Sequence, residues 1–576
     1  MPHGPSFALS DIPFSTQGSW LSLSPVVAQH RTGDTVHLIS HVGGMHPVLA
    51  LRPFTGDTPA EVRLHATFGT LAMEHTEGSV EAVFQQADVL RLRGHGLSLR
   101  IGAAEPELTP FTGTYLISDP LDGSHVFTSY ETGRRYRVTV LSGRADVVGA
   151  EALGRADRHL TLTPTDPGTT WEVALEELHA ARPPYRPPTN WTDTAAKARA
   201  DFTAYADRHL PWATPGTPAA ELAGYVLWSA TVDPAGYLTR PAVLMSKHWM
   251  NKLWSWDHCF NALALAEGDP RLALDQFLIP FDHQDDSGAL PDSVTHSEIL
   301  YNYVKPPIHG WALSKLRPHI DLTAEELTNL YDRLTRWTDF WLTTRRAPGA
   351  TLPHYHHGND SGWDNATTFL TRRVRVSADL SAFLVLQLDE LSALAALLDR
   401  PEESERHAKD AAEILDALLT GLWDGERFRS RPAGDEEAAA PSDSLLDLMP
   451  IVLGERLPQE IADRLADRIS THLTPHGLAT EHPDSPYYEA DGYWRGPIWA
   501  PSTVLIEDGL RRAGHRELAD EVSARFRLLC ETHGFAENFD ALTGQGQRDR
   551  AYTWTASGYL LLARAHLRRG TAHPAR

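Results

Sequence analysis

The first third of the chain alternates apolar and polar positions in short runs. Runs such as TVHLISHVG, VLRLRGHGLSLRIG and TTWEVALEEL contain β-branched residues and are separated by Gly, Asp and Pro. A period of two with turn residues between the runs is typical of half-buried antiparallel strands. We therefore predict a β-sandwich domain over residues 1–180, and we find no catalytic constellation in it.

The period changes after a proline-rich segment at residues 181–191. Its four prolines, at 183, 184, 187 and 188, can continue neither a strand ladder nor a helix interior, so we predict a linker. From residue 192 onward, apolar residues recur at three- and four-residue spacing, which predicts about a dozen helices. No strand signal alternates with them and no fixed-period repeat is visible. We therefore predict a closed double ring of helices, an (α/α)6 barrel, over residues 192–576 of an α+β multidomain chain.

The charge balance excludes several classes of partner. The chain has 75 acidic and 52 basic residues, a net charge of −23, which repels phosphate backbones and anionic lipid. The N-terminus MPHGPSFALSDIPFS has neither the basic start nor the apolar run of a secretory signal. No apolar window approaches the ~18 residues that span a bilayer. We expect a cytoplasmic protein that binds no nucleic acid and no membrane; the sequence does not indicate its oligomeric state.

Tryptophans in polar surroundings indicate a carbohydrate site. Of 16 tryptophans, all but Trp20 and Trp171 follow residue 190, many of them in the segments SKHWMNKLWSWDH, GNDSGWDNA, GYWRGPIW and YTWTA. Aromatic planes stack on the C–H faces of pyranoses, while polar neighbours hold the hydroxyl groups. Several such clusters in predicted loops favour a sugar-binding cleft over a plain core.

Two carboxyl groups stand out as candidates for glycoside hydrolysis, which needs one acid and one carboxylate base or nucleophile. Asp364 lies between Trp363 and Asn365, and an aromatic wall can keep a carboxyl group protonated. Glu537 lies in the segment GFAENFDALTGQG. Taken alone, Asp364 is better explained as a loop or helix cap and Glu537 as a solvated acid, so the context of each residue must decide. Asp257 is compatible with an N-cap for the helix DHCFNALALAE and with a ligand for sugar hydroxyls.

Five motifs in order resemble glycoside hydrolase family 63 and its mannosylglycerate hydrolase-like relatives. They are LWSWDHCFNALALA, KPPIHGWAL, GNDSGWDN, GYWRGPIW and ENFDALTGQG. The resemblance implies an (α/α)6 barrel and inverting chemistry, with Asp364 as general acid and Glu537 as general base. The residues expected around the cleaved sugar are Trp254, Trp256, Asp257, Lys305, Trp363, Asn365, Trp494, Arg495, Trp499 and Trp554.

The predicted activity is that of an inverting, exo-acting α-glucosidase on short, neutral α-glucosides. One alternative is a hydrolase of glucosylglycerate or mannosylglycerate, with Lys305, Arg372, Arg373 or Arg375 as a clamp for the carboxylate. Others are a debranching α-1,6-glucosidase, a sugar epimerase with His258 or His309 as base, and a non-catalytic carbohydrate-binding protein.

The predicted chemistry needs no cofactor and no metal. The segments HYHH and DHQDD do not show a convincing metal-ligand geometry. The chain departs from many relatives after GWDN, where Ala366, Thr367 and Thr368 replace Ser-Pro-Arg, which puts the substrate rather than the acid in doubt.

Overall fold

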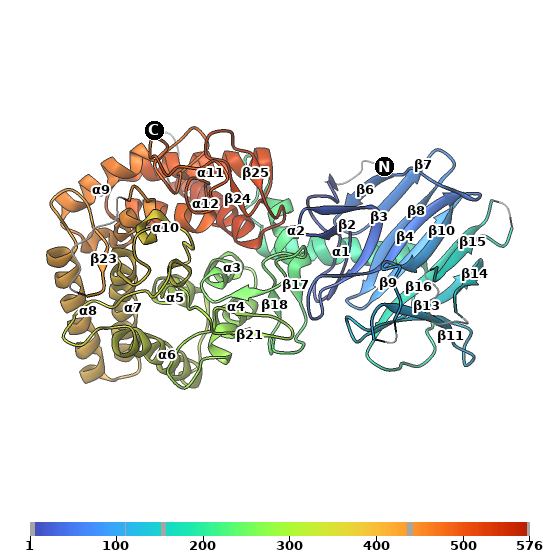
Figure 1. Cartoon of the computed structure of the whole chain (residues 1–576), viewed down its shortest axis with the longest axis horizontal. Coiled ribbons are helices and arrows are strands. Elements are labelled where there is room, and N and C mark those ends of the chain that lie inside the picture. Colours follow the sequence, from blue (N-terminus) through green and yellow to red (C-terminus); the bar gives the residue numbers. More distant parts are fainter. Residues whose placement is uncertain (1–5, 110, 151–156, 167, 435–441, 573–576) are drawn as a thin grey trace. The chain divides into compact units, whose positions relative to one another are not determined.

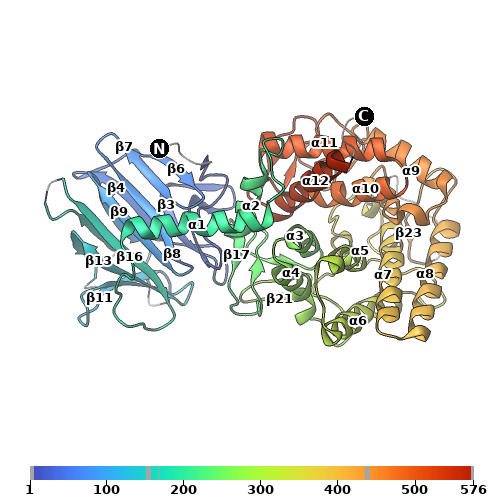
Figure 2. The same cartoon turned by 180° about the vertical axis from the view of Figure 1, so that it is seen from behind.

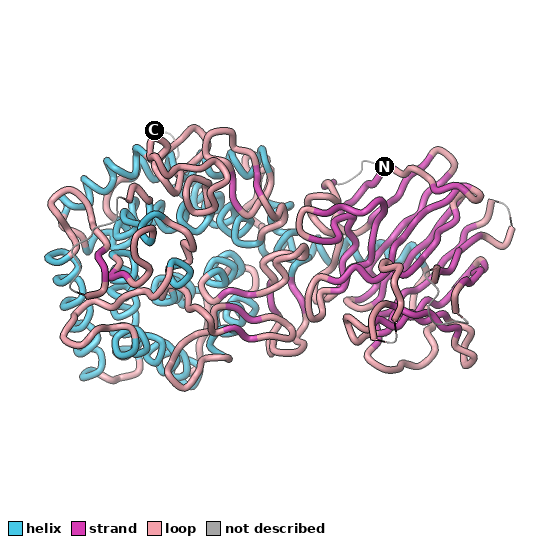
Figure 3. Tube along the Cα trace, viewed as in Figure 1, coloured by secondary structure: helices cyan, strands magenta, loops and turns pink. Residues whose placement is uncertain are grey.

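The computed structural model describes the whole chain except residues 1–5, 110, 151–156, 167, 435–441 and 573–576. The chain forms two compact units. The first comprises Met1–Arg208, Gly224–Gly236 and Val243–Asn251, and the second comprises His209–Ala223, Tyr237–Ala242 and Lys252–Arg576. Strands gather chiefly in the first unit and helices chiefly in the second (Figure 3).

The N-terminal unit is built from two antiparallel sheets (Figure 1). The larger sheet has nine strands in the order β1 (Ser6–Phe7), β6 (Arg63–Thr67), β7 (Leu71–His75), β8 (Gly78–Gln86), β9 (Val89–His95), β16 (Thr170–Leu178), β13 (Arg135–Ser142), β12 (His125–Ser129) and β11 (Thr114–Ser118). The other has the order β14 (Arg144–Val148), β15 (His159–Thr163), β10 (Ser98–Ala103), β4 (His46–Thr55), β3 (Arg31–Ser40) and β2 (Leu21–Ala28), with β5 (Thr58–Pro59) paired to β4. The predicted antiparallel, β-rich N-terminal region is confirmed.

One hydrophobic core lies between the two sheets. Along β10, Leu99 and Ile101 are fully buried while the alternate residues are only half-buried. This is the alternation that the period of two predicts. Strands of both sheets contribute to the same cluster, for example Leu38 of β3 and Leu92 of β9. The unit therefore has a core of its own.

Six helices of the C-terminal unit form a closed cycle of packed neighbours. They are α3 (Asp257–Leu265), α5 (His309–Leu316), α7 (Ala378–Leu397), η5 (Leu445–Arg456), α10 (Ala500–Arg512) and α12 (Thr553–Ala572), and α12 packs back on α3. Others pack against this cycle (Figure 2): α4 (Pro270–Asp282) on α3, α6 (Ala324–Asp339) and α8 (Pro401–Gly421) on α7, α9 (Gln459–Thr471) on η5, and α11 (Arg516–His533) on α10 and α12. The predicted helical C-terminal region is confirmed.

Helix α6 shows how the sequence sets an individual element. Thr323 accepts a hydrogen bond from the Glu326 N–H at 3.2 Å, and Glu326 accepts one from the Thr323 N–H at 2.8 Å. This reciprocal capping box fixes the start of the helix. Its buried residues include Leu330, Leu334 and Trp337, so one apolar face packs inward and the rest faces water.

Helix α7 corrects one expectation. It has 20 residues and enough apolar character to cross a membrane by length and composition, so the prediction that no window of that length exists is wrong. In this structure 67% of that window is buried inside the protein, where α7 contacts α5, α6, α8 and η5. Burial of most of the helix against these neighbours accounts for its largely apolar sequence. The cytoplasmic location stays a prediction.

Candidate active site

Four of the predicted site residues lie where helices of the cycle begin. Trp256 and Asp257 start α3, Trp499 directly precedes α10, and Trp554 is in the first turn of α12. Asp364 lies in the loop between the short helices η3 (Gly358–Ser361) and η4 (Thr367–Phe369). The motifs are thus carried by loops, which the closed cycle of helices supports.

Five of the six predicted tryptophans form one continuous cluster. Ring centroids are 4.7 Å apart for Trp363 and Trp494, and 4.1 Å apart for Trp494 and Trp499, whose planes differ by 5°. Trp554 lies 5.4 Å from Trp499 and 5.8 Å from Trp256. Each of the five is at most 4% exposed. The five indoles therefore form one buried aromatic cluster and are not separate exposed rings.

Trp254 and Arg495 lie outside this cluster. Trp254, in β19 (Leu253–Trp254), is half-buried and faces the Lys252 ammonium at 5.7 Å from its ring centroid. Arg495 forms an ion pair with Glu489 at 2.9 Å. Its Nε is buried and has no hydrogen-bond partner among the described residues. That unsatisfied donor is available to an acceptor such as a sugar oxygen.

Asn365 braces two loops. It is exposed. Its Nδ2 donates to the Gly492 carbonyl at 3.0 Å, and its Oδ1 accepts from the Trp494 N–H at 3.0 Å. These bonds connect the loop that carries Asp364 to the GYWRGPIW segment. Its predicted contact with substrate stays a prediction.

A buried charge network surrounds Asp364. The Lys305 ammonium is 5% exposed, forms an ion pair with Asp292 at 2.9 Å and donates to the Asn359 carbonyl at 2.9 Å. Burial raises the pKa of Asp364; Lys305 opposes this shift, and Asp292 adds to it. The balance favours the protonated form that a general acid needs.

Asp257 is a second buried carboxyl group near Lys305. It is 2% exposed, and its Oδ1 has no hydrogen-bond partner among the described residues. Burial raises the pKa of Asp257 well above its usual range, although Lys305 opposes the shift. Trp256, not Asp257, occupies the N-cap of α3 and makes no side-chain cap, so the interpretation of Asp257 as an N-cap is wrong. Its orphaned oxygen is instead suited to a hydroxyl donor.

Glu537 lies between α11 and β24 (Asn538–Phe539). It is 1% exposed, and neither carboxylate oxygen has a hydrogen-bond partner among the described residues. Burial and then the Asp549 carboxylate raise the pKa of Glu537 to about 8, while Arg548 lowers it and Asp364 raises it. Asp364 and Glu537, 173 positions apart in sequence, are thus within electrostatic reach of each other.

Sequence reasoning did not find Asp360, which holds the loop of the candidate acid. Asp360 is 1% exposed and accepts hydrogen bonds from Arg345 at 2.8 Å, from the His356 N–H at 2.8 Å and from the Val304 N–H at 3.2 Å. Asp360 lies in the same motif as Asp364, so the sequence did mark its position. The motif GNDSGWDN alone does not show which of its aspartates holds the loop and which is the candidate acid.

Both histidines considered as the base of an epimerase make hydrogen bonds within the protein, and His258 Nδ1 pairs with the Trp254 carbonyl at 3.2 Å. His309 is fully buried; its Nε2 donates to the Ser255 carbonyl at 3.0 Å and its Nδ1 accepts from Trp337 at 3.2 Å. Neither ring nitrogen is left to act as a base.

The two segments considered for metal binding have other contacts. Asp282 forms ion pairs with Arg240 at 2.6 Å and Arg333 at 2.8 Å, and His354 stacks on His356 at 5.3 Å. Within the described part of the chain, no group of three or more His, Cys, Asp or Glu side chains is placed to hold a metal ion.

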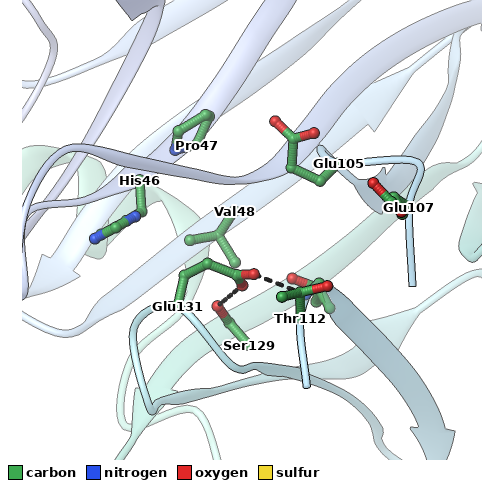
Figure 4. A pocket seen from close by; sticks show the side chains of 10 residues that line it. His46, Pro47, Val48, Glu105, Glu107, Thr112, Ser129 and Glu131 are labelled. Atoms are coloured by element: carbon green, nitrogen blue, oxygen red, sulfur yellow. Dashed lines mark hydrogen bonds between the residues drawn. The ribbon is translucent and has the colours of Figure 1, made fainter. Parts of the chain in front are cut away.

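The N-terminal unit has a hollow of its own, with a volume of about 380 Å³ (Figure 4). Three carboxylates line it, those of Glu105, Glu107 and Glu131. Glu131 accepts hydrogen bonds from the Gly113 N–H at 2.7 Å and from Ser129 at 3.1 Å. This carboxylate is thereby engaged in holding its own turn, and the hollow shows no arrangement for hydrolysis.

Comparison with known proteins identifies the family. Residues 250–555, more than half of the chain, match the model of the mannosylglycerate hydrolase MGH1-like glycoside hydrolase domain. The chain belongs to this family. Membership in the MGH1-like family makes the protein a glycoside hydrolase, as the motifs predicted.

Two relatives and one solved structure show the extent of the similarity. This MGH1-like chain is 25% identical to the mannosylglycerate hydrolase of Rubrobacter radiotolerans over 422 residues, covering 56% of this chain and 92% of that protein. It is 31% identical to the mannosylglycerate hydrolase of Thermus thermophilus over 190 residues, covering 32% and 44%. The crystal structure of a family 63 mannosylglycerate hydrolase from Thermus thermophilus in complex with glucose superposes with a TM-score of 0.51 at 22% identity, covering 59% of this chain and 98% of that one. It shows a shared fold.

Proposed function

We propose that this protein is an inverting, exo-acting hydrolase of small α-glycosides, with Asp364 as general acid and Glu537 as general base. The observation that carries the proposal is a pair of carboxyl groups, half-buried Asp364 and fully buried Glu537, which are close enough for Asp364 to raise the pKa of Glu537. They belong to the same unit as the cluster of indoles. Hydrolysis by inversion needs two such groups and a stacking surface for the sugar.

In the proposed reaction, protonated Asp364 donates its proton to the glycosidic oxygen as the bond to the anomeric carbon breaks. Glu537 takes a proton from the water that attacks the same carbon on the opposite face of the ring. The released sugar then has the inverted anomeric configuration. This mechanism requires a separation of ~6.5–9.5 Å between the two carboxyl groups, against ~5–5.5 Å in a retaining enzyme.

The helical unit fits the proposed chemistry as an (α/α)6 barrel. The closed cycle α3, α5, α7, η5, α10 and α12 would be the inner ring, and α4, α6, α8, α9 and α11 would belong to the outer ring. Loops at one end of such a ring converge on its axis, which brings residues as distant as Asp364 and Glu537 together. The orphaned Asp257 oxygen and Arg495 Nε would hold the sugar hydroxyls.

For the aglycone, we favour a small carboxylate such as the glycerate of mannosylglycerate or glucosylglycerate. His357 is close enough to lower the pKa of Asp364, and Arg373 makes a hydrogen bond to His357. Because the leaving group must contact the acid, these side chains would face the aglycone. Of the other clamp candidates, Lys305 is paired with Asp292, and Arg375 is 1% exposed beside the Ser430 carbonyl. The names of the relatives support the same aglycone.

A neutral α-glucoside is the second candidate. The related Thermus thermophilus enzyme is described in complex with glucose, and the net charge of −23 leaves the approach of a neutral substrate unaffected. Activity as a debranching α-1,6-glucosidase stays a prediction.

The assignment of acid and base is tested with Asp364→Asn and Glu537→Gln. Loss of either group should lower kcat on the best substrate by about 10²–10⁴-fold, because each transfers a proton in the transition state. Circular dichroism should show an intact fold. Near-normal turnover in either variant would remove the assignment.

The substrate is tested with purified protein and a panel of α-glucosides, α-mannosides and glycerate conjugates, with the released anomer followed by NMR. Arg373→Gln should lower kcat/KM for a glycerate conjugate more than for a neutral glycoside. Lys409→Gln, at an exposed site in α8, is the control. Equal effects of Arg373→Gln on both substrates would argue against an anionic aglycone.

A further inference from the structure

Two residues next to the candidate base have an unusual backbone conformation. Among the described residues, four non-glycine positions have positive φ, and two of them are Tyr493 (φ 64°) and Arg548 (φ 59°). For a residue with a β-carbon this conformation costs about 1–2 kcal/mol. The two side chains meet, since the Arg548 guanidinium lies 4.9 Å from the centre of the Tyr493 ring. Strain that is concentrated at one contact indicates a functional constraint.

The contacts of Arg548 join two segments of the candidate active site. Its guanidinium forms an ion pair with Asp491 at 2.6 Å, two residues before Tyr493, and donates to Asn538 Oδ1 at 3.0 Å. Asn538 directly follows Glu537. The side chain of Arg548 is 20% exposed and that of Asp491 is 71% exposed, so their ion pair is a solvent-exposed contact. The bond to Asn538, a fully buried residue, is the better shielded of the two.

The β24–β25 hairpin places Arg548 beside the base. Asn538 of β24 pairs with Gln547 of β25 (Gly546–Gln547) in antiparallel register. Glu537 directly precedes Asn538 and Arg548 directly follows Gln547, so the two residues flank the same end of the hairpin. The Glu537 N–H donates to the Asp549 carbonyl at 2.7 Å, which continues the ladder past Arg548. The backbone of the base is thus held against the Arg548–Asp549 dipeptide.

The groups around Glu537 oppose its ionisation, and the positive charge of Arg548 counteracts them. The negative charge of Glu537 is disfavoured by two nearby carboxylates, those of Asp549 and Asp364. Glu537 in turn raises the pKa of two neighbouring phenols, those of Tyr493 and Tyr552. Burial acts in the same direction, and Arg548 opposes it. A general base must be ionised before it can accept a proton from water.

We propose that Arg548 is a positioning residue for hydrolysis, which holds the strand of Glu537 against the Tyr493 segment and supplies positive charge that favours the ionised Glu537 carboxylate. The inference rests on the role of Glu537 as base proposed above. Arg548 itself takes no part in proton transfer.

The pH dependence of kcat/KM distinguishes this role from a merely structural one. The productive enzyme has Asp364 protonated and Glu537 ionised. Below the pKa of both groups, the productive fraction depends on the pKa of Glu537; above both, it depends only on that of Asp364. Loss of the Arg548 charge should therefore lower kcat/KM at low pH and have little effect at high pH.

The test compares Arg548→Asn and Arg548→Lys with the natural enzyme from about pH 6 to about pH 10. Asparagine tolerates the left-handed conformation, so the fold is expected to persist. Arg548→Asn should lower kcat/KM about tenfold at the acid end for each unit by which the pKa of Glu537 rises, and its curve should approach that of the natural enzyme at the alkaline end. Arg548→Lys should restore most of the loss. Lys409→Gln, the exposed control in α8, should produce no pH-dependent change.

Unchanged kcat/KM in Arg548→Asn, or an equal loss at every pH, would overturn the inference. Glu537→Gln separates this failure from that of the proposed function. If Glu537→Gln keeps its turnover, the proposed base is wrong. If Glu537→Gln is inactive and Arg548→Asn shows a pH-independent loss, only the role of Arg548 is wrong.

Discussion

The carboxyl group of Glu537 lies in the protein without a hydrogen-bond partner among the described residues, which makes its ionisation costly. An unfolded glutamate with a pKa near 4.5 becomes, on folding, a group with a pKa of about 8. The folded state therefore binds this proton more tightly. Its contribution to stability is complete below the unfolded pKa and is lost as pH rises through the folded one.

Glu537→Gln should remove this pH-dependent loss. The free energy of unfolding of the variant, relative to the natural protein, should increase between about pH 4.5 and about pH 8, by up to about 1.4 kcal/mol for each unit of pKa shift. Urea unfolding at acid, neutral and alkaline pH measures this difference. A difference that stays constant with pH would contradict the raised pKa.

Asp549 should have the opposite kinetic effect to Arg548. Its carboxylate raises the pKa of Glu537, while its Oδ1 accepts from the Ala551 N–H at 3.0 Å, a bond that asparagine can keep. Asp549→Asn should therefore raise kcat/KM on the acid side of the pH profile and leave it nearly unchanged on the alkaline side. A lower kcat/KM with an unshifted profile would mean that Asp549 acts only by holding the loop.

For individual residues, the sequence identified those that lie in motifs but not the side chains that contact them in the folded protein. The indole cluster and the candidate carboxyl groups Asp364 and Glu537 could be predicted because their motifs carry them. Asp292, Arg548 and Asp549 could not, since each acts through a neighbour that only folding brings close. The left-handed backbone of Tyr493 was also invisible, because neither Gly nor Asn marks it.

At the scale of elements, the loop that carries Asp364 depends on close packing at Gly362. This residue has φ 74°, and a β-carbon there would lie 2.5 Å from the Trp256 ring. The turn thus allows the Trp256 indole to contact the backbone of the loop that carries Asp364. Only glycine satisfies both the conformation and the space.

Gly362→Ala should destabilise the protein and displace Trp256. Gly349 is a matched control, because it has φ 78° and no atom within 4 Å of its β-carbon position. Gly349→Ala should cost only the backbone strain, about 1–2 kcal/mol, and leave kcat/KM unchanged. Gly362→Ala should cost more and also lower kcat/KM. Equal melting temperatures and activities in the two variants would show that the contact with Trp256 is unimportant.

The types of element followed from the periodicity of the sequence, but their arrangement did not. A period of two predicted strands such as β10, and three- and four-residue spacing predicted helices such as α6. The order of strands in each sheet and the closure of the helical cycle depend on contacts between distant segments, which no local pattern encodes. The interpretation of Asp257 as an N-cap failed because α3 begins at that residue and not after it, while its role as a ligand for sugar hydroxyls stays a prediction.

At the scale of the whole molecule, the net charge of −23 opposes compactness through self-repulsion. Salt screens this repulsion, since the Debye length falls from about 30 Å at 0.01 M to about 3 Å at 1 M. We therefore expect the melting temperature to rise with NaCl concentration at neutral pH. Differential scanning calorimetry across this range measures the effect, and a melting temperature that falls with salt would contradict it.

The largely apolar helix α7 has a consequence during synthesis. When this segment leaves the ribosome, η5, α10 and α12, which complete the cycle, have not yet been made. By length and composition it resembles the stretches that membrane-insertion machinery selects. We therefore expect early docking of α7 on α5 and α6, which precede it in the chain, to cover its apolar side chains until translation supplies the remaining helices.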